Sequence, residues 1–159
     1  MHVDRPIKVS IDQALYIKTG AIGEDSHAEG YLSDASGLHA HAEGERTLAT
    51  GTNAHSEGYH TKAFGMNSHA EGYVTQALAS NSHTEGQYTH AEGEFGHAEG
   101  FDTKASGTHS HAEGKSSCAD ANYSHAEGED TESSGLYSHS EGSHTEAQGE
   151  CSHTEGYNT

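Results

Sequence analysis

The sequence has few of the residues from which a conventional protein core is built. Of its 159 residues only 30% are hydrophobic, tryptophan is absent, and proline occurs once, at Pro6. Without periodicity, such a composition is typical of disordered chains. An ordinary globular core is therefore excluded, and a folded state must draw its order from a repeat.

Basic residues are also scarce. Seven Lys and Arg stand against 25 Asp and Glu, so the formal net charge is −18 with neutral histidine. Proteins that bind nucleic acid or anionic membrane surfaces neutralise phosphates with Lys and Arg. We therefore expect no nucleic-acid partner and no membrane insertion. Protonation of all sixteen histidines would change the formal charge from −18 to −2, so the surface changes character as the pH falls from about 7 to 5.

Cysteine and long apolar runs are nearly missing. Cys118 and Cys151 fall at different places in the repeat, and we expect two free thiols. No segment reaches the ~18 apolar residues of a membrane span. Residues 1–25 lack the basic start and apolar run of a secretory signal. Because Thr159 stops part-way through a repeat, we expect the chain to be a piece of a longer protein.

What the chain has is a strict repeat. Histidine recurs every fourteen residues from His27 to His153, in ten copies, and each copy is followed two positions later by Glu and then by Gly. A period held without insertion predicts a solenoid, in which each repeat is one coil stacked on the last. The array is expected over residues 19–159, as about ten coils with the last one incomplete.

The first residues do not follow the repeat. Ile7, Val9 and Ile11 alternate with other residues, as in a β-strand. The first coil of a solenoid needs a cover, so residues 1–18 are predicted to be an N-terminal strand and cap.

Each repeat has two halves of similar pattern. The first reads small-His-small-Glu-Gly, as at 68–72, and the second reads Thr-x-Ala-x-Gly, as at 103–107. Both alternate with period two, so we expect two five-residue strands per coil. The inward positions hold only Ser, Ala, Thr or Gly, which predicts a very narrow interior. Glycine suits positive φ or close backbone approach at tight corners. Residues 89–93 place the first-half motif in a second half, which indicates that the half-coils are interchangeable in shape.

The two outward faces differ. The outward residues of the second half vary freely, as on a solvent-facing surface, whereas those of the first half are His and Glu in all ten copies. Aromatic residues flank the invariant His and Glu positions: Tyr31, Tyr59, Tyr73, Phe101 and Tyr157 follow the Gly, and Phe95, Tyr123 and Tyr137 precede the Ser. A face that never changes within one molecule indicates packing against a partner.

The fourteen-residue pattern small-x-small-x-Gly followed by Thr-x-Ala-x-Gly resembles the head repeats of trimeric autotransporter adhesins. The His-Ala-Glu-Gly motif is also similar to repeats in phage and prophage tail appendages. The resemblance covers roughly residues 19–159 and implies a left-handed parallel β-roll that associates as a homotrimer. Those heads carry aliphatic residues where His and Glu stand here, so the departure indicates a polar interface.

We therefore expect the invariant residues to form the trimer interface. A thin roll buries little apolar area, so its folded state needs stabilisation by oligomerisation or by another cross-link. A column of glutamates in one chain is self-repulsive unless histidines of another chain pair with it. The predicted interface residues are His27, Glu29, His41, Glu43, His55, Glu57, His69, Glu71, His83, Glu85, His97, Glu99, His111, Glu113, His125, Glu127, His139, Glu141, His153 and Glu155.

Metal binding is the alternative use of these residues, because His and Glu are ligands of first-row metals. The sharpest local candidates are His39 with His41 and His109 with His111. We favour a hydrogen-bonded His–Glu ladder, since the spacing follows from the coil period and not from a ligand geometry. No cofactor is required, and a divalent metal remains an option.

Catalysis and ice binding are disfavoured. Every coil contains His and Glu, and all but residues 40–53 also contain Ser, whereas an active site is a unique pocket. The Thr column is expected to face inward, which leaves no regular hydroxyl array outside. The sequence thus predicts a non-enzymatic structural and adhesive segment of an extracellular trimeric fibre, on a bacterial surface or a virion, that attaches to a protein or glycan receptor. The alternatives are a phage or phage-like tail appendage and a metal-binding repeat protein.

Overall fold

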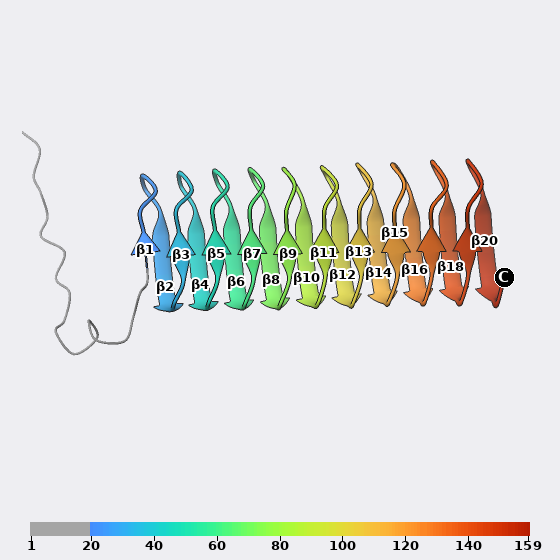
Figure 1. The fold of residues 1–159 in the computed structure, drawn as a ribbon, viewed down its shortest axis with the longest axis horizontal. Helices are drawn as coiled ribbons and strands as arrows, with labels where there is room; N and C mark the ends of the chain where they lie inside the picture. The colour runs from blue at the N-terminus through green and yellow to red at the C-terminus, as the bar shows by residue number, and fades with distance from the viewer. Residues whose placement is uncertain (1–19) are drawn as a thin grey trace, which may run out of the picture.

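A computed structural model describes residues 20–159, which form an all-β parallel solenoid of ten coils (Figure 1). The coils lie side by side along one straight axis from β1 to β20. The fourteen-residue coil and the β-solenoid class are confirmed. The predicted cap, residues 1–18, lies outside the described residues.

Each coil contributes one long and one short strand. The long strands form a ten-stranded sheet: β2 (His27–Tyr31), β4 (His41–Glu45), β6 (His55–Tyr59), β8 (His69–Tyr73), β10 (His83–Gln87), β12 (His97–Phe101), β14 (His111–Lys115), β16 (His125–Glu129), β18 (His139–Ser143) and β20 (His153–Tyr157). The short strands form a second ten-stranded sheet: β1 (Gly20–Ala21), β3 (Asp34–Ala35), β5 (Leu48–Ala49), β7 (Lys62–Ala63), β9 (Gln76–Ala77), β11 (His90–Ala91), β13 (Lys104–Ala105), β15 (Cys118–Ala119), β17 (Glu132–Ser133) and β19 (Glu146–Ala147).

The second strand of each coil is shorter than predicted. After Ala35 the ladder stops, because the N–H groups of Ser36 and Gly37 both donate to the carbonyl of Ala49, at 3.0 and 3.2 Å. Two successive donors on one acceptor interrupt the alternating hydrogen bonds of a sheet. The prediction of five residues is correct for the first strand and wrong for the second, where the chain turns after two.

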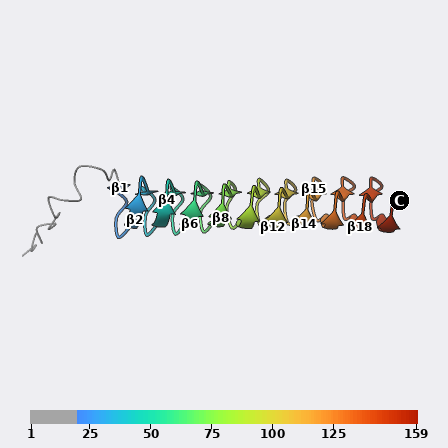
Figure 2. The same cartoon turned by 90° about the horizontal axis from the view of Figure 1, so that it is seen from below.

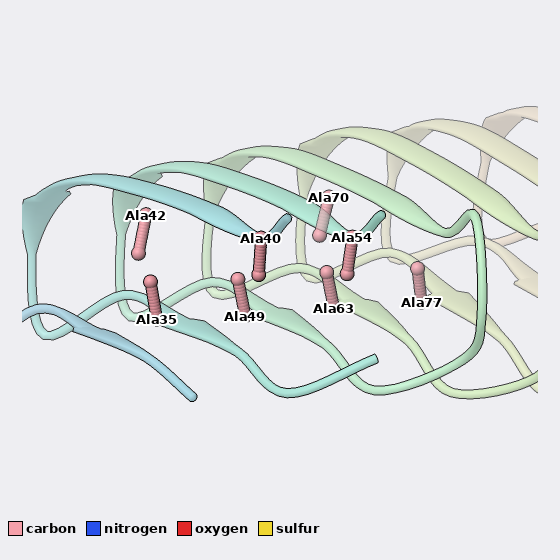
Figure 3. Packing of buried hydrophobic residues seen from close by; sticks show 8 residues of the cluster. All are labelled: Ala35, Ala40, Ala42, Ala49, Ala54, Ala63, Ala70 and Ala77. Carbon is pink, nitrogen blue, oxygen red and sulfur yellow. The ribbon is translucent and has the colours of Figure 1, made fainter. Parts of the chain in front are cut away.

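The interior is as narrow as the small residues indicate. Alanines from both sheets meet across it, among them Ala42 and Ala35, which are fully buried (Figure 3). Seen from below, the rod is thinner than in the first view along its whole length (Figure 2). The Thr column is also inside, as predicted, because Thr61, Thr75 and Thr89 have no exposed surface. The described part of the rod therefore has no outward array of these hydroxyls.

The corners hold a feature that the sequence analysis missed. Twenty non-glycine residues, two in each coil, have φ between 52° and 59°, and they include the β-branched Val74. This left-handed region costs an L-residue about 1–2 kcal/mol. In eighteen of the twenty, all but Asp25 and Leu32 of the first coil, the N–H donates to a carbonyl of the preceding coil, as in the 2.8 Å bond from Val74 to Tyr59. Stacking thus imposes a conformation that these side chains do not favour.

The glycines with positive φ lie inside the long strands, whereas they were expected at the corners. Gly100 has a φ of +110°, and a Cβ on it would lie 2.2 Å from the carbonyl oxygen of Gly114 in the next coil. The glycine therefore permits both the backbone angle and the close approach of adjacent coils.

Candidate interaction face

The long strands carry the ten His and ten Glu of the repeat on the outside of their sheet. We call this surface the histidine–glutamate face. Each residue of a long strand pairs with the residue fourteen positions on, in the next long strand, so His83 lies beside His97 and Glu85 beside Glu99. The parallel register therefore brings all twenty predicted interface residues together, in one column of imidazoles and one of carboxylates. The trimer itself stays a prediction.

The imidazoles form a continuous stack. Each successive pair from His41 to His153 is stacked, with ring centroids 4.6–4.9 Å apart. His27 ends the stack with an edge-on contact to His41 at 5.2 Å. The ring spacing equals the strand spacing of a sheet. The stack therefore fixes the orientation of these rings and aligns their nitrogens along the rod.

The glutamates approach the imidazoles without bonding to them. The Nε2–Oε2 distance within a coil is 3.4–3.9 Å in eight coils. The Nε2 atoms of seven histidines are buried and find no hydrogen-bond partner among the described residues: His55, His69, His83, His97, His111, His125 and His139. A buried polar atom without a partner costs about 1–3 kcal/mol. A hydrogen-bonded His–Glu ladder therefore does not form between these histidines and glutamates within one chain.

Burial also makes the central imidazoles harder to protonate. The pKa values of His69, His83, His97, His111 and His125 lie below the usual range. Desolvation is the largest cause, and the next histidine of the stack lowers the pKa further, while nearby glutamates act in the opposite direction. These rings are therefore neutral at pH 7.

The two histidine pairs predicted as metal ligands do not come together in the structure. His39 lies at a corner, where its Nδ1 is 3.2 Å from Oδ1 of Asn53, and His109 stacks between Phe95 and Tyr123. His41 lies in the stack. Within residues 20–159, three groups bring three ligand atoms within 4.8 Å of one another: His111, Glu113 and His125; His125, Glu127 and His139; His139, Glu141 and His153. Only His111 of the four candidates belongs to one of these groups.

Sequence reasoning missed the other members of these groups because it looked for ligands within one coil. The groups combine histidines fourteen residues apart, such as His111 and His125, which the stacking of coils places side by side. The fourteen-residue period was the available signal, since it predicts that equivalent residues become neighbours.

The flanking aromatic residues form short stacks at the corners. Phe95, His109, Tyr123 and Tyr137 follow one another with centroids 4.6–5.1 Å apart. On the other corner, Tyr59 and Tyr73 stack at 5.0 Å, and Tyr88 makes edge-on contacts with Tyr73 and Phe101. Exposed aromatic side chains thus border the histidine–glutamate face on both sides.

The opposite sheet presents varied side chains. Glu92 pairs with Lys104 at 3.0 Å, and Cys118 lies two residues from Asp120, whose carboxylate accepts its S–H at 3.3 Å. Burial, with this bond, raises the pKa of the Cys118 thiol to about 12. Cys118 and Cys151 are both free thiols, as predicted.

Neither the protein-family models nor the curated proteins with which the chain was compared contain a match. In the described part of the chain, no helix has the length and hydropathy that a membrane crossing requires.

Proposed function

We propose that this chain is a non-enzymatic structural and adhesive segment of an extracellular fibre, in which three copies associate through the histidine–glutamate face. One observation carries the proposal. The outward residues of one sheet are His and Glu in all ten coils, and their side chains are partly exposed, whereas the outward residues of the other sheet vary. Imidazoles and carboxylates repeated at a constant spacing match a partner surface of the same periodicity, and a second copy of this chain supplies one.

The core supports association as well. Its buried residues are Ala, Ser, Thr and Gly, and no larger apolar side chain of residues 20–159 is fully buried. Small side chains remove little apolar area from water, so a single rod gains little from hydrophobic burial. Packing of three rods would bury the half-exposed rings and carboxylates and the aromatic residues that border them.

The adhesive part of the proposal rests on the varied sheet and the corners. In a trimer with the histidine–glutamate face inside, these surfaces face the surroundings and offer side chains of changing size and charge to a protein or glycan receptor. The resemblance to adhesin heads favours a left-handed roll on a bacterial surface, and the similarity to tail appendages gives a virion as the second setting. Ten repeated pairs of His and Glu with no unique one support a role without catalysis.

Native mass spectrometry at neutral pH tests the interface. We expect a trimer for the wild-type chain and partial dissociation for the double variant Glu85→Gln and Glu99→Gln, which weakens pairing between the chains. The matched control is Glu132→Gln with Glu146→Gln, which removes the same charge from the opposite sheet and should remain trimeric. A monomeric wild type, or equal behaviour of the two variants, contradicts the proposed interface.

A further inference from the structure

The C-terminal half of the histidine–glutamate face contains three groups of ligand atoms that overlap. The first cluster is His111, Glu113 and His125; the middle cluster is His125, Glu127 and His139; the last cluster is His139, Glu141 and His153. In each, two imidazoles of adjacent coils and the carboxylate between them place one ligand atom each within 4.8 Å of the others.

We propose that this part of the face binds two zinc-type divalent ions per chain, one in the first cluster and one in the last. Two imidazole nitrogens and one carboxylate oxygen form a ligand set that suits Zn²⁺, with a fourth position open to water. These clusters lie within one chain, so the inference goes beyond the proposed trimer and does not depend on it.

The ligand atoms are unused in the protein itself. Nε2 of His111, His125 and His139 is buried and has no hydrogen-bond partner among the described residues. Their nearest carboxylate oxygens lie at 3.4–3.9 Å, outside hydrogen-bonding contact. A metal ion would satisfy the lone pair of each nitrogen and the charge of the glutamate at the same time.

One distance in the first cluster already equals that of a tetrahedral site. With Zn–N and Zn–O bonds of about 2.1 Å, two ligand atoms lie about 3.4 Å apart. Nε2 of His111 and Oε2 of Glu113 are already 3.4 Å apart. The rings of His111 and His125 are parallel within 1° at a centroid distance of 4.7 Å, so they must tilt toward each other to bind one ion. Metal binding is thus expected to break the regular stack at the occupied gap.

The overlap of the clusters limits the number of ions to two. The Nε2 of a neutral imidazole has one lone pair and ligates one ion. The middle cluster shares His125 with the first and His139 with the last. An ion in the middle cluster therefore excludes both others, whereas the first and last clusters can be filled together.

Zinc titration of the full chain tests this inference. Excess Mg²⁺ is present, and after desalting the bound zinc is counted by native mass spectrometry and metal analysis. We expect two tightly held ions per chain in the wild type, one in His125→Ala or in His139→Ala, and none in the double variant. His69→Ala is the control, because His69 lies in the same stack but in no cluster, and it should retain two. Glu113→Gln keeps the stack and should weaken the first site alone.

The oligomer mass separates this inference from the proposed function. A trimer without zinc would leave the fibre proposal standing and overturn the metal sites, whereas a monomer with two ions would do the reverse. Displacement of the zinc by Mg²⁺ would indicate loose binding to surface carboxylates and contradict the sites. Retention of two ions by the double variant would also contradict the proposed zinc sites. So would one ion for each coil position of a trimer, because ligands from three chains would then hold it.

Discussion

At the scale of the residue, a glycine in a long strand has up to two separate reasons to be glycine, its backbone angle and the close approach of the next coil. Gly86 has a φ of +105°, and a Cβ on it would lie 2.2 Å from the carbonyl oxygen of Gly100 in the next coil. Gly156 has a similar φ of +120°, but the nearest atom to its Cβ would be Cγ2 of Thr159, at 3.8 Å. The two positions therefore share the backbone angle and differ in the presence of a following coil.

We expect Gly156→Ala to cost only the backbone strain, about 1–3 kcal/mol of the free energy of unfolding. Gly86→Ala adds a clash with backbone that cannot move without separating two coils, so its loss should be clearly larger. Thermal and urea unfolding followed by circular dichroism measure both. Equal losses would mean that the close approach of the coils does not constrain this position.

At the scale of the element, the unit of the structure is the coil. Each strand pairs with the strands fourteen residues before and after it, as β8 does with β6 and β10. Repeat arrays of this kind draw their stability from single repeats and the interfaces between neighbours. The two half-coils are not equivalent, however, because one contains a five-residue strand and the other a two-residue strand. The predicted interchangeability of the half-coils is therefore wrong.

Two deletions test this description. Removal of residues 69–82 takes out one whole coil and joins Ser68 to His83, so the register of every later coil is kept. We expect a folded rod with a small change in thermal stability. Removal of residues 69–75 keeps the inward pattern of small residues but moves every later half-coil to the other sheet.

For the seven-residue deletion we expect loss of the cooperative thermal transition, because second-half sequences would then occupy the long strands. Ala79, for example, would take the place of a glycine with positive φ. Far-UV circular dichroism and the thermal transition of both variants are the measurements. A half-coil deletion as stable as the whole-coil deletion would restore the view that the halves are interchangeable.

At the scale of the whole molecule, the charge of the rod and the histidine stack respond to pH in opposite ways. Acidification reduces the net charge of −18 and with it the repulsion along the rod. It also protonates imidazoles that burial keeps neutral. The groups around His69 are the rings of His55 and His83 and the carboxylates of Glu57, Glu71 and Glu85.

We expect the thermal midpoint to fall as the pH is lowered from 8 to 5 in about 1 M salt, where the Debye length is about 3 Å and long-range repulsion is screened. The pKa values of His69 and His83 are lower in the folded chain than the usual 6.5. At a pH between the folded-state pKa and 6.5, the unfolded chain binds more protons than the folded chain. The contribution of the neutral histidines to the free energy of unfolding is therefore complete above pH 6.5 and is lost as the pH falls through the folded-state pKa.

The control for this prediction is a pair of variants. His69→Gln with His83→Gln should flatten the dependence of the midpoint on pH, whereas His144→Gln, at a corner beside Asp130, should leave it largely unchanged. A midpoint that rises or stays constant on acidification of the wild type would show that the stack tolerates protonation.

Much of the fold follows from the sequence alone. The fourteen-residue period determines the coil, and the inward Ser, Ala, Thr and Gly determine how closely the two sheets lie. The histidine–glutamate face is equally readable, because alternation along a strand separates its outward residues from the inward ones. These features are local or strictly periodic, so no knowledge of distant contacts is needed.

Other features were decided only by the stacking of coils. His-Ala-Glu-Gly occurs at both 90–93 and 97–100, yet it forms a two-residue strand in one place and a five-residue strand in the other. Gly100 has a positive φ and Gly93 does not, and His97 joins the stack while His90 faces Gln76 on the opposite sheet. The same four residues take different conformations because the neighbouring coils offer different hydrogen-bond partners at the two positions.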